Sequence, residues 1–437
     1  MAYTEVTRTS YGSRLKNSAG GIFTGLLLFI GATILLWWNE GRTIKTTRML
    51  NRAQEIAVEM ENPNVKDAEL DGKLVHAVAL ATTEDSLSDP TFGIGAVAIK
   101  LSRSVEYYQW VEESKTQTKD KIGGGQEHTT TYTYKKEWSS SPVQSENFKD
   151  PAYQGKNFTY TTFDDYNAKA DRVTFGAYKL NSSQIGSIGG RINMEANIDE
   201  SIKQQLENVC KDIAKARKGG AISGISSTSD TVKDVVKEAA KDLVNSGYKY
   251  VHISGNQIYL GENPNIPEIG DLRITFTKVL PTTVSILAKV SGDTFTAHKD
   301  KNGQTLSVLY TGERTMDEMF ESEHSSNKLI SWILRILGVI LVIAALKMMI
   351  SILPTLLKVL PFLGNITETI LGLACSVIGF AWSLIVIGVA WLRYRPLIGI
   401  PILAAAIALI FWLATKSKSK KNIATNAANN QNINNSI

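Results

Sequence analysis

Apolar residues are concentrated in four long runs, one near the start of the chain and three close to its end, with a large polar block between them. The runs cover Ile22 to Trp38, Leu329 to Leu346, Leu371 to Leu392 and Leu397 to Ala414. Each is close to the ~20 residues that a helix needs to cross the hydrocarbon core of a bilayer. The pattern predicts four transmembrane helices flanking one soluble domain, residues 39–328.

Within the polar block, apolar and polar residues alternate over short stretches, which is typical of half-buried β-strands. Two stretches with helical spacing, at about 199–218 and 231–246, form a predicted helical insertion over about 199–246. The predicted fold class is therefore an α+β membrane protein with a strand-rich domain. The predicted strands are Leu74–Leu80, Val97–Leu101, Val105–Val111, Thr129–Lys135, Asn157–Phe163, Arg172–Leu180, Val251–Leu260 (with a turn at Gly255-Asn256), Leu272–Leu280, Val284–Val290, Phe295–His298 and Leu306–Tyr310 (after a turn at Asn302-Gly303).

Two segments lack an apolar pattern. Ser114 to His128 is charged and contains three consecutive glycines, and the tail, residues 415–437, is basic and then rich in asparagine. Neither can bury enough apolar surface to fold alone, so both are expected to be disordered.

Lysine and arginine beside the runs set the expected orientation, because basic flanks resist crossing a membrane. Basic residues occur before the first run, after the second and after the fourth. Residues 1–21, 347–370 and 415–437 are thus expected on the cytoplasmic face, with the domain and a short turn, residues 393–396, on the other. Arg42 after the first run and Arg395 in the short turn oppose this assignment.

Polar and aromatic residues in or beside the runs are candidates for anchoring and packing. Trp37, Trp38 and Trp391 suit the membrane interface. Arg335 must either extend to the interface or pair inside the bundle, and its place near the outer end of the run favours the first. Glu40 is the partner in the alternative. Gly372 and Ser376 have the small-xxx-small spacing that permits close helix packing.

Composition excludes several classes of function. The net charge is +5, and the excess of basic residues lies beside the apolar runs, where attraction to anionic lipids explains it better than nucleic-acid binding does. Cys210 and Cys375 are the two cysteines of the chain, which excludes a four-thiolate zinc site. The sequence lacks the nucleophile-elbow, phosphate-loop, zinc-protease and dinucleotide motifs, and no cofactor is expected.

Several short motifs resemble the LUMA family of four-pass membrane proteins, known from the inner nuclear membrane and the ER and also found in bacteria. The run Tyr108-Gln109-Trp110-Val111-Glu112 is the most specific, and Asp89-Pro90 and Gly270-Asp271 belong to two others. Similar stretches are Asn39–Arg42, Gly72–His76, Leu87–Gly93, Lys100–Glu112, Tyr132–Trp138, Asn147-Phe148, Glu262–Arg273 and Trp391–Leu397.

The resemblance implies a large luminal or equivalent domain, both termini on the opposite face, and a role in organising membrane-protein complexes with self-association. In nuclear-envelope members it implies contact with lamins and emerin. It implies no catalytic residues. The asparagine-rich tail favours a bacterial member, with the domain in the periplasm; a eukaryotic member would lie in the ER or inner nuclear membrane.

The sequence thus predicts a non-enzymatic scaffold whose partners are other membrane proteins, further copies of itself and lipids. One alternative is a membrane-anchored hydrolase or lipid-processing enzyme that uses His76, Asp89 or Asp271. A second alternative is an accessory subunit of a channel or transporter, which is disfavoured because only Arg335 is a charged residue well inside a run.

Overall fold

A computed structural model describes residues 3–218, 248–359 and 361–394, together with residues 400, 401, 404, 405, 407, 408 and 412. The chain divides into two compact units. The strand-rich unit comprises Met1–Glu5, Glu55–Thr116 and Thr130–Met319, and the helical unit comprises Val6–Gln54, Gln117–Thr129 and Phe320–Ile437. The helices on either side of the strand-rich unit extend beyond the apolar runs, and the domain boundaries at residues 39 and 328 stay a prediction.

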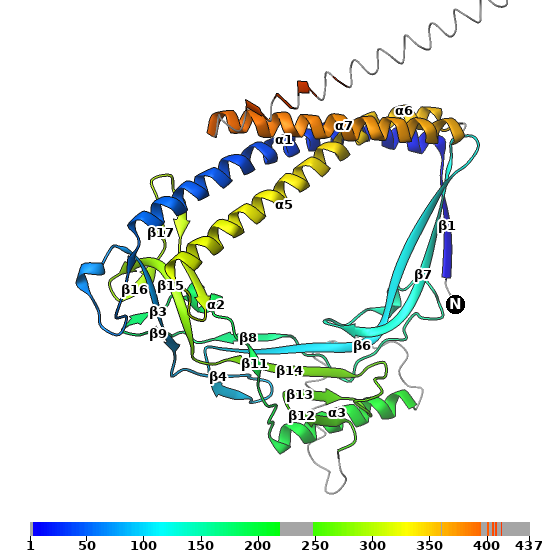
Figure 1. Cartoon of the computed structure of the whole chain (residues 1–437). Coiled ribbons are helices and arrows are strands. Elements are labelled where there is room, and N and C mark those ends of the chain that lie inside the picture. The colour runs from blue at the N-terminus through cyan, green and yellow to red at the C-terminus, as the bar shows by residue number, and fades with distance from the viewer. Residues whose placement is uncertain are drawn as a thin grey trace, which may run out of the picture. The chain divides into compact units, whose positions relative to one another are not determined.

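One sheet of the strand-rich unit has eight strands and the order β1-β7-β6-β14-β13-β12, with β8 beside β6 and β11 beside β14 (Figure 1). Strand β14 pairs with β6 over eight residues, from Leu272 opposite Tyr107 to Val279 opposite Lys100. Helix α3 contributes Leu206 to the apolar core that this sheet covers. The elements are β1 (Tyr3–Thr9), β6 (Lys100–Asp120), β7 (Gln126–Ser139), β8 (Tyr166–Lys169), β11 (Ile192–Asn193), α3 (Glu200–Lys218), β12 (Val251–Ser254), β13 (Gln257–Leu260) and β14 (Leu272–Val279).

The second sheet has seven strands in the order β19-β15-β16-β10-β9-β3-β2. An additional pairing between β15 and β3 closes five of these strands into a small barrel. The barrel encloses a separate core that contains Val75, Phe175, Ile286 and Phe295. The elements are β2 (Val58–Glu59), β3 (Leu74–Thr82), β9 (Thr174–Phe175), β10 (Tyr178–Lys179), α2 (Ser182–Ser187), β15 (Thr282–Ser291), β16 (Thr294–Thr296) and β19 (Val308–Thr311), with two short strand pairs, β4 (Ser86–Ser88) with β5 (Gly95–Val97) and β17 (His298–Lys299) with β18 (Thr305–Leu306).

Most predicted strands are confirmed, and so are the helix at 199–218 and both hairpin turns. Asn157–Phe163 is not a strand, because its polar backbone groups bond to the Tyr107 hydroxyl and to the Gly270 carbonyl rather than to a ladder. The predicted strand at 172–180 is two strands, β9 and β10, which turn at Gly176 (φ +57°). The second helix of the insertion, 231–246, lies outside the described residues.

The segment from Ser114 to His128, expected to be disordered, is mostly strand. Strand β6 continues to Asp120 and β7 begins at Gln126, so only the turn between them is irregular. Threonine hydroxyls bridge the two strands, as between Thr116 and Thr130 at 2.9 Å. Cross-strand threonine pairs stabilise a ribbon without any apolar core, which explains why composition alone was misleading here.

Three long helices of the helical unit contain the first three apolar runs: α1 (Tyr11–Ile56), α5 (Met316–Ile350) and α7 (Pro361–Tyr394). In the described part of the chain, three helices, α1, α5 and α7, are long and apolar enough to cross a membrane. A short helix, α6 (Ile352–Leu357), follows α5 within the predicted connection 347–370. Residues 395–399 and most of the fourth run lie outside the described residues, and therefore three spans are observed rather than four.

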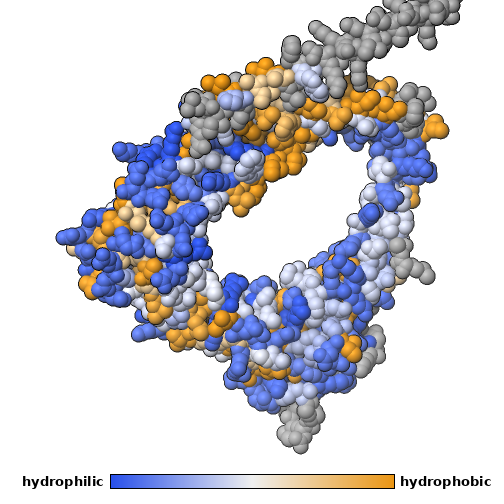
Figure 2. All heavy atoms as spheres, viewed as in Figure 1, coloured by the Kyte–Doolittle hydropathy of each residue, from blue (hydrophilic) through white to orange (hydrophobic). Residues whose placement is uncertain are grey.

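The three helices pack through a small apolar core of Leu36 from α1, Val342 from α5 and Ile387 from α7. Their remaining apolar side chains face outwards, as the orange surface over α5 and α7 shows (Figure 2). A surface of this kind is stable only in lipid or beneath a partner.

Candidate functional sites

The central feature of the helical unit is a buried ion pair between α1 and α5. Arg335 approaches Glu40 in a bidentate arrangement, with Nε–Oε1 and Nη2–Oε2 distances of 2.6 and 2.7 Å. Glu40 is 1% exposed and Arg335 15% exposed. Arg335 therefore pairs with Glu40 inside the helix bundle. The favoured prediction, that Arg335 extends alone to the membrane interface, is wrong, and the alternative of pairing with Glu40 is confirmed.

Aromatic residues complete the surroundings of this pair. The indole nitrogen of Trp391, in α7, donates to the second carboxylate oxygen of Glu40. The guanidinium of Arg335 lies 5.2 Å from the ring centre of Trp332 and 5.3 Å from that of Trp391. A weakly hydrated guanidinium is well suited to such stacking, so the cluster fastens all three helices to one another.

A stripe of buried polar groups continues from the ion pair along the α1–α5 contact. The Asn327 amide donates to the Thr43 carbonyl at 3.0 Å and to the Thr47 hydroxyl at 3.1 Å. The Asn39 amide donates to the Ser331 carbonyl at 3.1 Å, and both of these side chains are at most 2% exposed. The residues of this stripe follow four-residue spacing on each helix: Asn39, Thr43 and Thr47 on α1, and Asn327, Ser331 and Arg335 on α5.

Sequence reasoning missed most of this stripe. Its signal was present, because polar residues four apart lie on one helix face. Arg42, predicted as an anchor, joins the stripe by donating to the Asn327 side chain at 3.2 Å. Trp37 and Trp38 are 36% and 54% exposed, which agrees with contact with lipid. Arg395 lies outside the described residues.

The closest helix packing occurs at glycines other than Gly372. A Cβ atom added at Gly379 would lie 2.8 Å from Ile343, and one at Gly338 would lie 2.5 Å from Leu36. A Cβ atom at Gly372 would approach nothing closer than 3.9 Å, and the Ser376 hydroxyl donates to the Gly372 carbonyl within α7.

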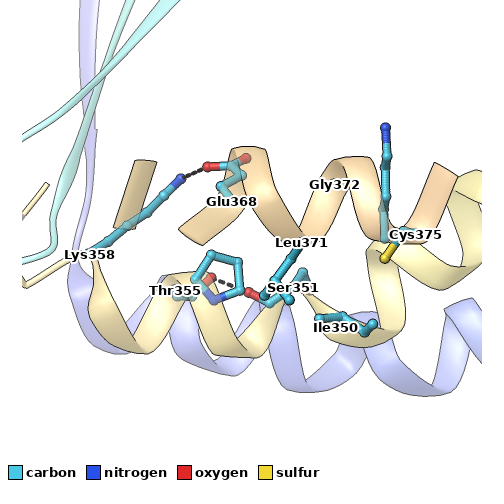
Figure 3. Close-up of a pocket in the computed structure, with 10 residues that line it drawn as sticks. Ile350, Ser351, Thr355, Lys358, Glu368, Leu371, Gly372 and Cys375 are labelled. Atoms are coloured by element: carbon cyan, nitrogen blue, oxygen red, sulfur yellow. Dashed lines mark hydrogen bonds and ion pairs between the residues drawn. The ribbon is translucent and has the colours of Figure 1, made fainter. Parts of the chain in front are cut away.

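Gly372 instead lines a cavity of about 230 Å³ formed by the end of α5, α6 and the start of α7 (Figure 3). Lys358 reaches across to Glu368, with an N–O distance of 2.5 Å. The hydroxyls of Ser351 and Thr355 donate to carbonyls of their own helical turns. The polar groups of the lining are thus mostly satisfied within the protein.

Two of the family motifs in the strand-rich unit, the one that begins at Tyr108 and the Gly270-Asp271 turn, meet near the middle of β6, although they are more than 150 residues apart in sequence. Tyr108 exchanges two backbone hydrogen bonds with the Gly270-Asp271 turn, at 2.8 and 3.0 Å. Gly270 has φ +102°, and a Cβ atom there would lie 2.1 Å from Phe158. Only glycine fits this position, which accounts for its place in the motif.

The other residues of the Tyr-Gln-Trp-Val-Glu run hold the loop that follows β7. Gln109, which is 1% exposed, accepts from the Val143 amide and donates to the Phe158 carbonyl. Glu112 accepts a hydrogen bond from the Tyr134 hydroxyl at 2.6 Å. Burial, together with this hydrogen bond, raises the pKa of Tyr134 to about 12. The ring of Trp110 packs against Tyr153 with centroids 4.9 Å apart. The motif therefore positions a loop.

The three residues of the hydrolase alternative each have separate partners. His76 places Nδ1 2.6 Å from a carboxylate oxygen of Glu59 and Nε2 2.9 Å from the Arg314 carbonyl oxygen, so both ring nitrogens have partners within the fold. Asp89, next to the exposed Pro90, forms two bonds of 2.7 and 2.8 Å with Arg103.

Asp271, the third residue, accepts from the Tyr259 hydroxyl and the Glu268 amide. Burial raises the pKa of the Asp271 carboxyl and, with Asp271 beside it, raises the pKa of Tyr259. In the described residues, no three His, Cys, Asp or Glu side chains gather as metal ligands would. The side chains of His76, Asp89 and Asp271 therefore form hydrogen bonds or ion pairs within the fold.

The helices and their buried polar stripe define an integral membrane protein that carries a strand-rich unit between its first and second membrane helices. The sequence profile of the family described as Transmembrane protein 43 matches residues 107–396. The chain belongs to this family, which confirms the family predicted from the motifs.

Relatives include human Transmembrane protein 43, 28% identical over 424 residues that cover 93% of each chain. The Transmembrane protein 43 homolog of Drosophila melanogaster is 25% identical over 395 residues, which cover 89% of this chain and 92% of its own. No solved structure matches. These relatives are animal proteins and give no support to the expectation of a bacterial member.

Proposed function

We propose that the protein is a non-enzymatic membrane scaffold, which organises membrane-protein complexes through its strand-rich unit and through self-association. The observation that supports this most directly is the polar stripe between α1 and α5. α1 ends at Ile56, two residues before β2, and α5 begins at Met316, five residues after β19. The stripe fastens together the two helices through which the chain enters and leaves the strand-rich unit.

A fixed pair of connections suits a scaffold, because it limits the orientations that the attached unit can adopt and so lowers the entropy lost when a partner binds. The outward-facing apolar side chains of α1, α5 and α7 offer a second contact surface, for lipid and for other membrane helices. Since the relatives are animal proteins, the ER and inner nuclear membrane are the proposed location.

Capture from native membranes tests the proposal. Two differently tagged copies are co-expressed, solubilised mildly and captured through one tag, and the second copy, the co-captured proteins and the lipids are measured. We expect the second copy and a reproducible set of membrane proteins. A chain that is recovered alone and monomeric would contradict the scaffold.

Matched variants sharpen this experiment. Glu40→Gln removes the buried charge and should reduce the captured partners several-fold, whereas Lys135→Gln removes one side of an ion pair whose partners, Glu113 and Glu137, are half exposed and should have no effect.

The enzymatic alternative is tested with Asp89→Asn and His76→Gln. If either variant folds normally but abolishes a measured hydrolytic activity of the purified protein, the scaffold proposal is wrong.

A further inference from the structure

The cavity beside Gly372 lies where two apolar runs meet polar sequence. The second run ends at Leu346, one residue before Lys347, and the third run begins at Leu371, one residue before Gly372. All of the lining residues belong to one continuous part of the helical unit, residues 347–375. Because these residues border the ends of two membrane helices, the cavity lies at the level where the headgroups and acyl chains of a bilayer meet.

The lining of the cavity is half polar and half apolar, as an amphipathic ligand requires. Its apolar members include Ile350 at the end of α5, and Leu371 and Cys375 on α7 (Figure 3). Its polar members include two lysines, Lys347 and Lys358. A lining of this kind suits a molecule with a charged head and a hydrocarbon body.

Lys347 carries the charge of the lining that is available to a ligand. The other lysine, Lys358, lies 2.5 Å from Glu368 and 3.3 Å from Asp120, so its charge is compensated within the helical unit. Lys347 is exposed, and in the part of the chain that the structure describes it forms neither a hydrogen bond nor an ion pair. Its ammonium group attracts an anionic phosphate as a compact point charge.

The start of α1 supplies a second exposed lysine near the same end of the helical unit. The Ser18 hydroxyl lies 3.0 Å from the hydroxyl of Thr355, which lines the cavity, so this part of α1 borders the cavity wall. Lys16, two residues earlier, is exposed and has no ion pair with any described residue. Two uncompensated cations therefore belong to the segments around the cavity, which favours an anionic ligand.

A lysine at the end of an apolar run often extends to the membrane interface without binding a specific partner. Lys328 is an example, since it is exposed and immediately precedes Leu329, the first residue of the second run. Lys328 does not line the cavity, whereas Lys347, at the other end of the same run, does. The cavity is therefore the feature that separates a lipid site from general attraction to a charged surface.

We propose that this cavity binds the headgroup region of one anionic phospholipid. The lipid phosphate contacts Lys347, and the first carbons of an acyl chain contact Ile350 and Leu371. The volume of about 230 Å³ is below the about 300–1,000 Å³ of sites that enclose a whole small ligand, so it suits the part of a lipid next to its headgroup. A free phosphate ion would leave the apolar half of the lining without a contact, which favours the lipid as the source of the phosphate.

Lipid selectivity of the full-length chain tests the proposal. The purified protein in detergent micelles is titrated with phosphatidylserine or phosphatidylcholine, and the lipids bound to each protein are counted by native mass spectrometry. We expect the first phosphatidylserine to bind more tightly than the first phosphatidylcholine. Lys347→Gln should weaken this first phosphatidylserine about five-fold, the factor that corresponds to about 1 kcal/mol for one lysine near an anionic headgroup. The matched control, Lys328→Gln, should leave it unchanged.

A second variant tests the cavity rather than the charge. A Cβ atom at Gly372 would approach nothing closer than 3.9 Å, where it meets Cε of Lys347, so a larger side chain has room at this position. Gly372→Leu should fill the cavity and abolish the preference for phosphatidylserine while the melting temperature stays close to the native value. If Gly372→Leu does not fold, the comparison of Lys347→Gln with Lys328→Gln decides the matter by itself.

Three results would overturn the proposal. They are native affinity for phosphatidylserine in Lys347→Gln, an equal loss in Lys328→Gln, and an unchanged lipid preference in a folded Gly372→Leu variant. Soluble glycerophosphoserine separates the two sources of phosphate: if it displaces phosphatidylserine at equal concentration, the site takes a free phosphate group and the lipid proposal is wrong. None of these measurements needs a protein partner, so their failure is distinguishable from failure of the scaffold proposal.

Discussion

Removing one charge of the Glu40–Arg335 pair is the most direct perturbation of the helical unit. Glu40→Gln keeps an oxygen that can accept from the Trp391 indole but removes the negative charge that Arg335 faces. Since Glu40 is 1% exposed and Arg335 15% exposed, neither group reaches bulk water in the native state. The variant therefore leaves a guanidinium nearly buried without its counter-ion.

The expected loss follows from burial and geometry. Both donor–acceptor distances in the pair are 2.6–2.7 Å, so the interaction is charge-assisted and bidentate. Breaking a buried pair by removing one partner costs about 3–5 kcal/mol. An exposed pair such as Lys179–Asp293, with side chains 70% and 43% exposed, is worth about 0–1 kcal/mol and serves as the control.

Unfolding of the full-length chain in mixed micelles, followed by tryptophan fluorescence, measures this loss. Six of the eight tryptophans lie in or beside the apolar runs, so fluorescence reports mainly on the helical unit. A double-mutant cycle with Arg335→Met separates the coupling of the two charges from their individual contributions. We expect the double variant to be more stable than the sum of the single losses predicts.

Two results would refute this reasoning. One is a loss for Glu40→Gln no larger than that for the Lys179→Gln control. The other is strict additivity of the two single losses in the double variant. Arg335→Lys gives an independent check, because lysine keeps the charge but loses the planar fork, so an intermediate loss is expected.

Three further predictions concern the strand-rich unit. Gly270→Ala should lower the free energy of unfolding, measured in thermal melts, by about 2–5 kcal/mol, because the new side chain is strained at positive φ and collides with Phe158. The control Gly292→Ala, with φ +61° and open space around it, should cost only about 1–2 kcal/mol. Equal losses for the two variants would refute the packing argument. Burial raises the pKa of Cys210, so its thiol should resist maleimide at pH 8 until the protein unfolds, and rapid labelling of native protein would contradict its burial. The raised pKa of Asp271 means that the folded state holds this proton more tightly than the unfolded state, so its contribution to stability is greatest below about pH 4 and falls as pH rises through the folded pKa; melting temperatures should increasingly favour Asp271→Asn over the native chain across that range, and a constant difference would count against the shift.

The sequence by itself determined the membrane helices, most strands and the family. Apolar runs and alternating patterns are properties of consecutive residues, so they survive without knowledge of the fold. The same holds for α3 and for the turn at Gly255-Asn256. Even the choice of Glu40 as the candidate partner of Arg335 followed from positions along the chain, although the favoured alternative was a lone arginine.

Only the tertiary structure decided what contacts distant residues make. Closure of the barrel depends on pairing of β15 with β3, about 200 residues earlier in the chain, and Tyr108 meets Gly270 across a similar separation. The composition of Ser114 to His128 predicted disorder, but the structure pairs Asp120 of this segment with Arg14 and Lys358, which are remote in sequence, and buries it. A local pattern records which residues favour water or lipid, whereas the partner of a charge depends on where the folded chain brings it, and that is the physical reason for the division.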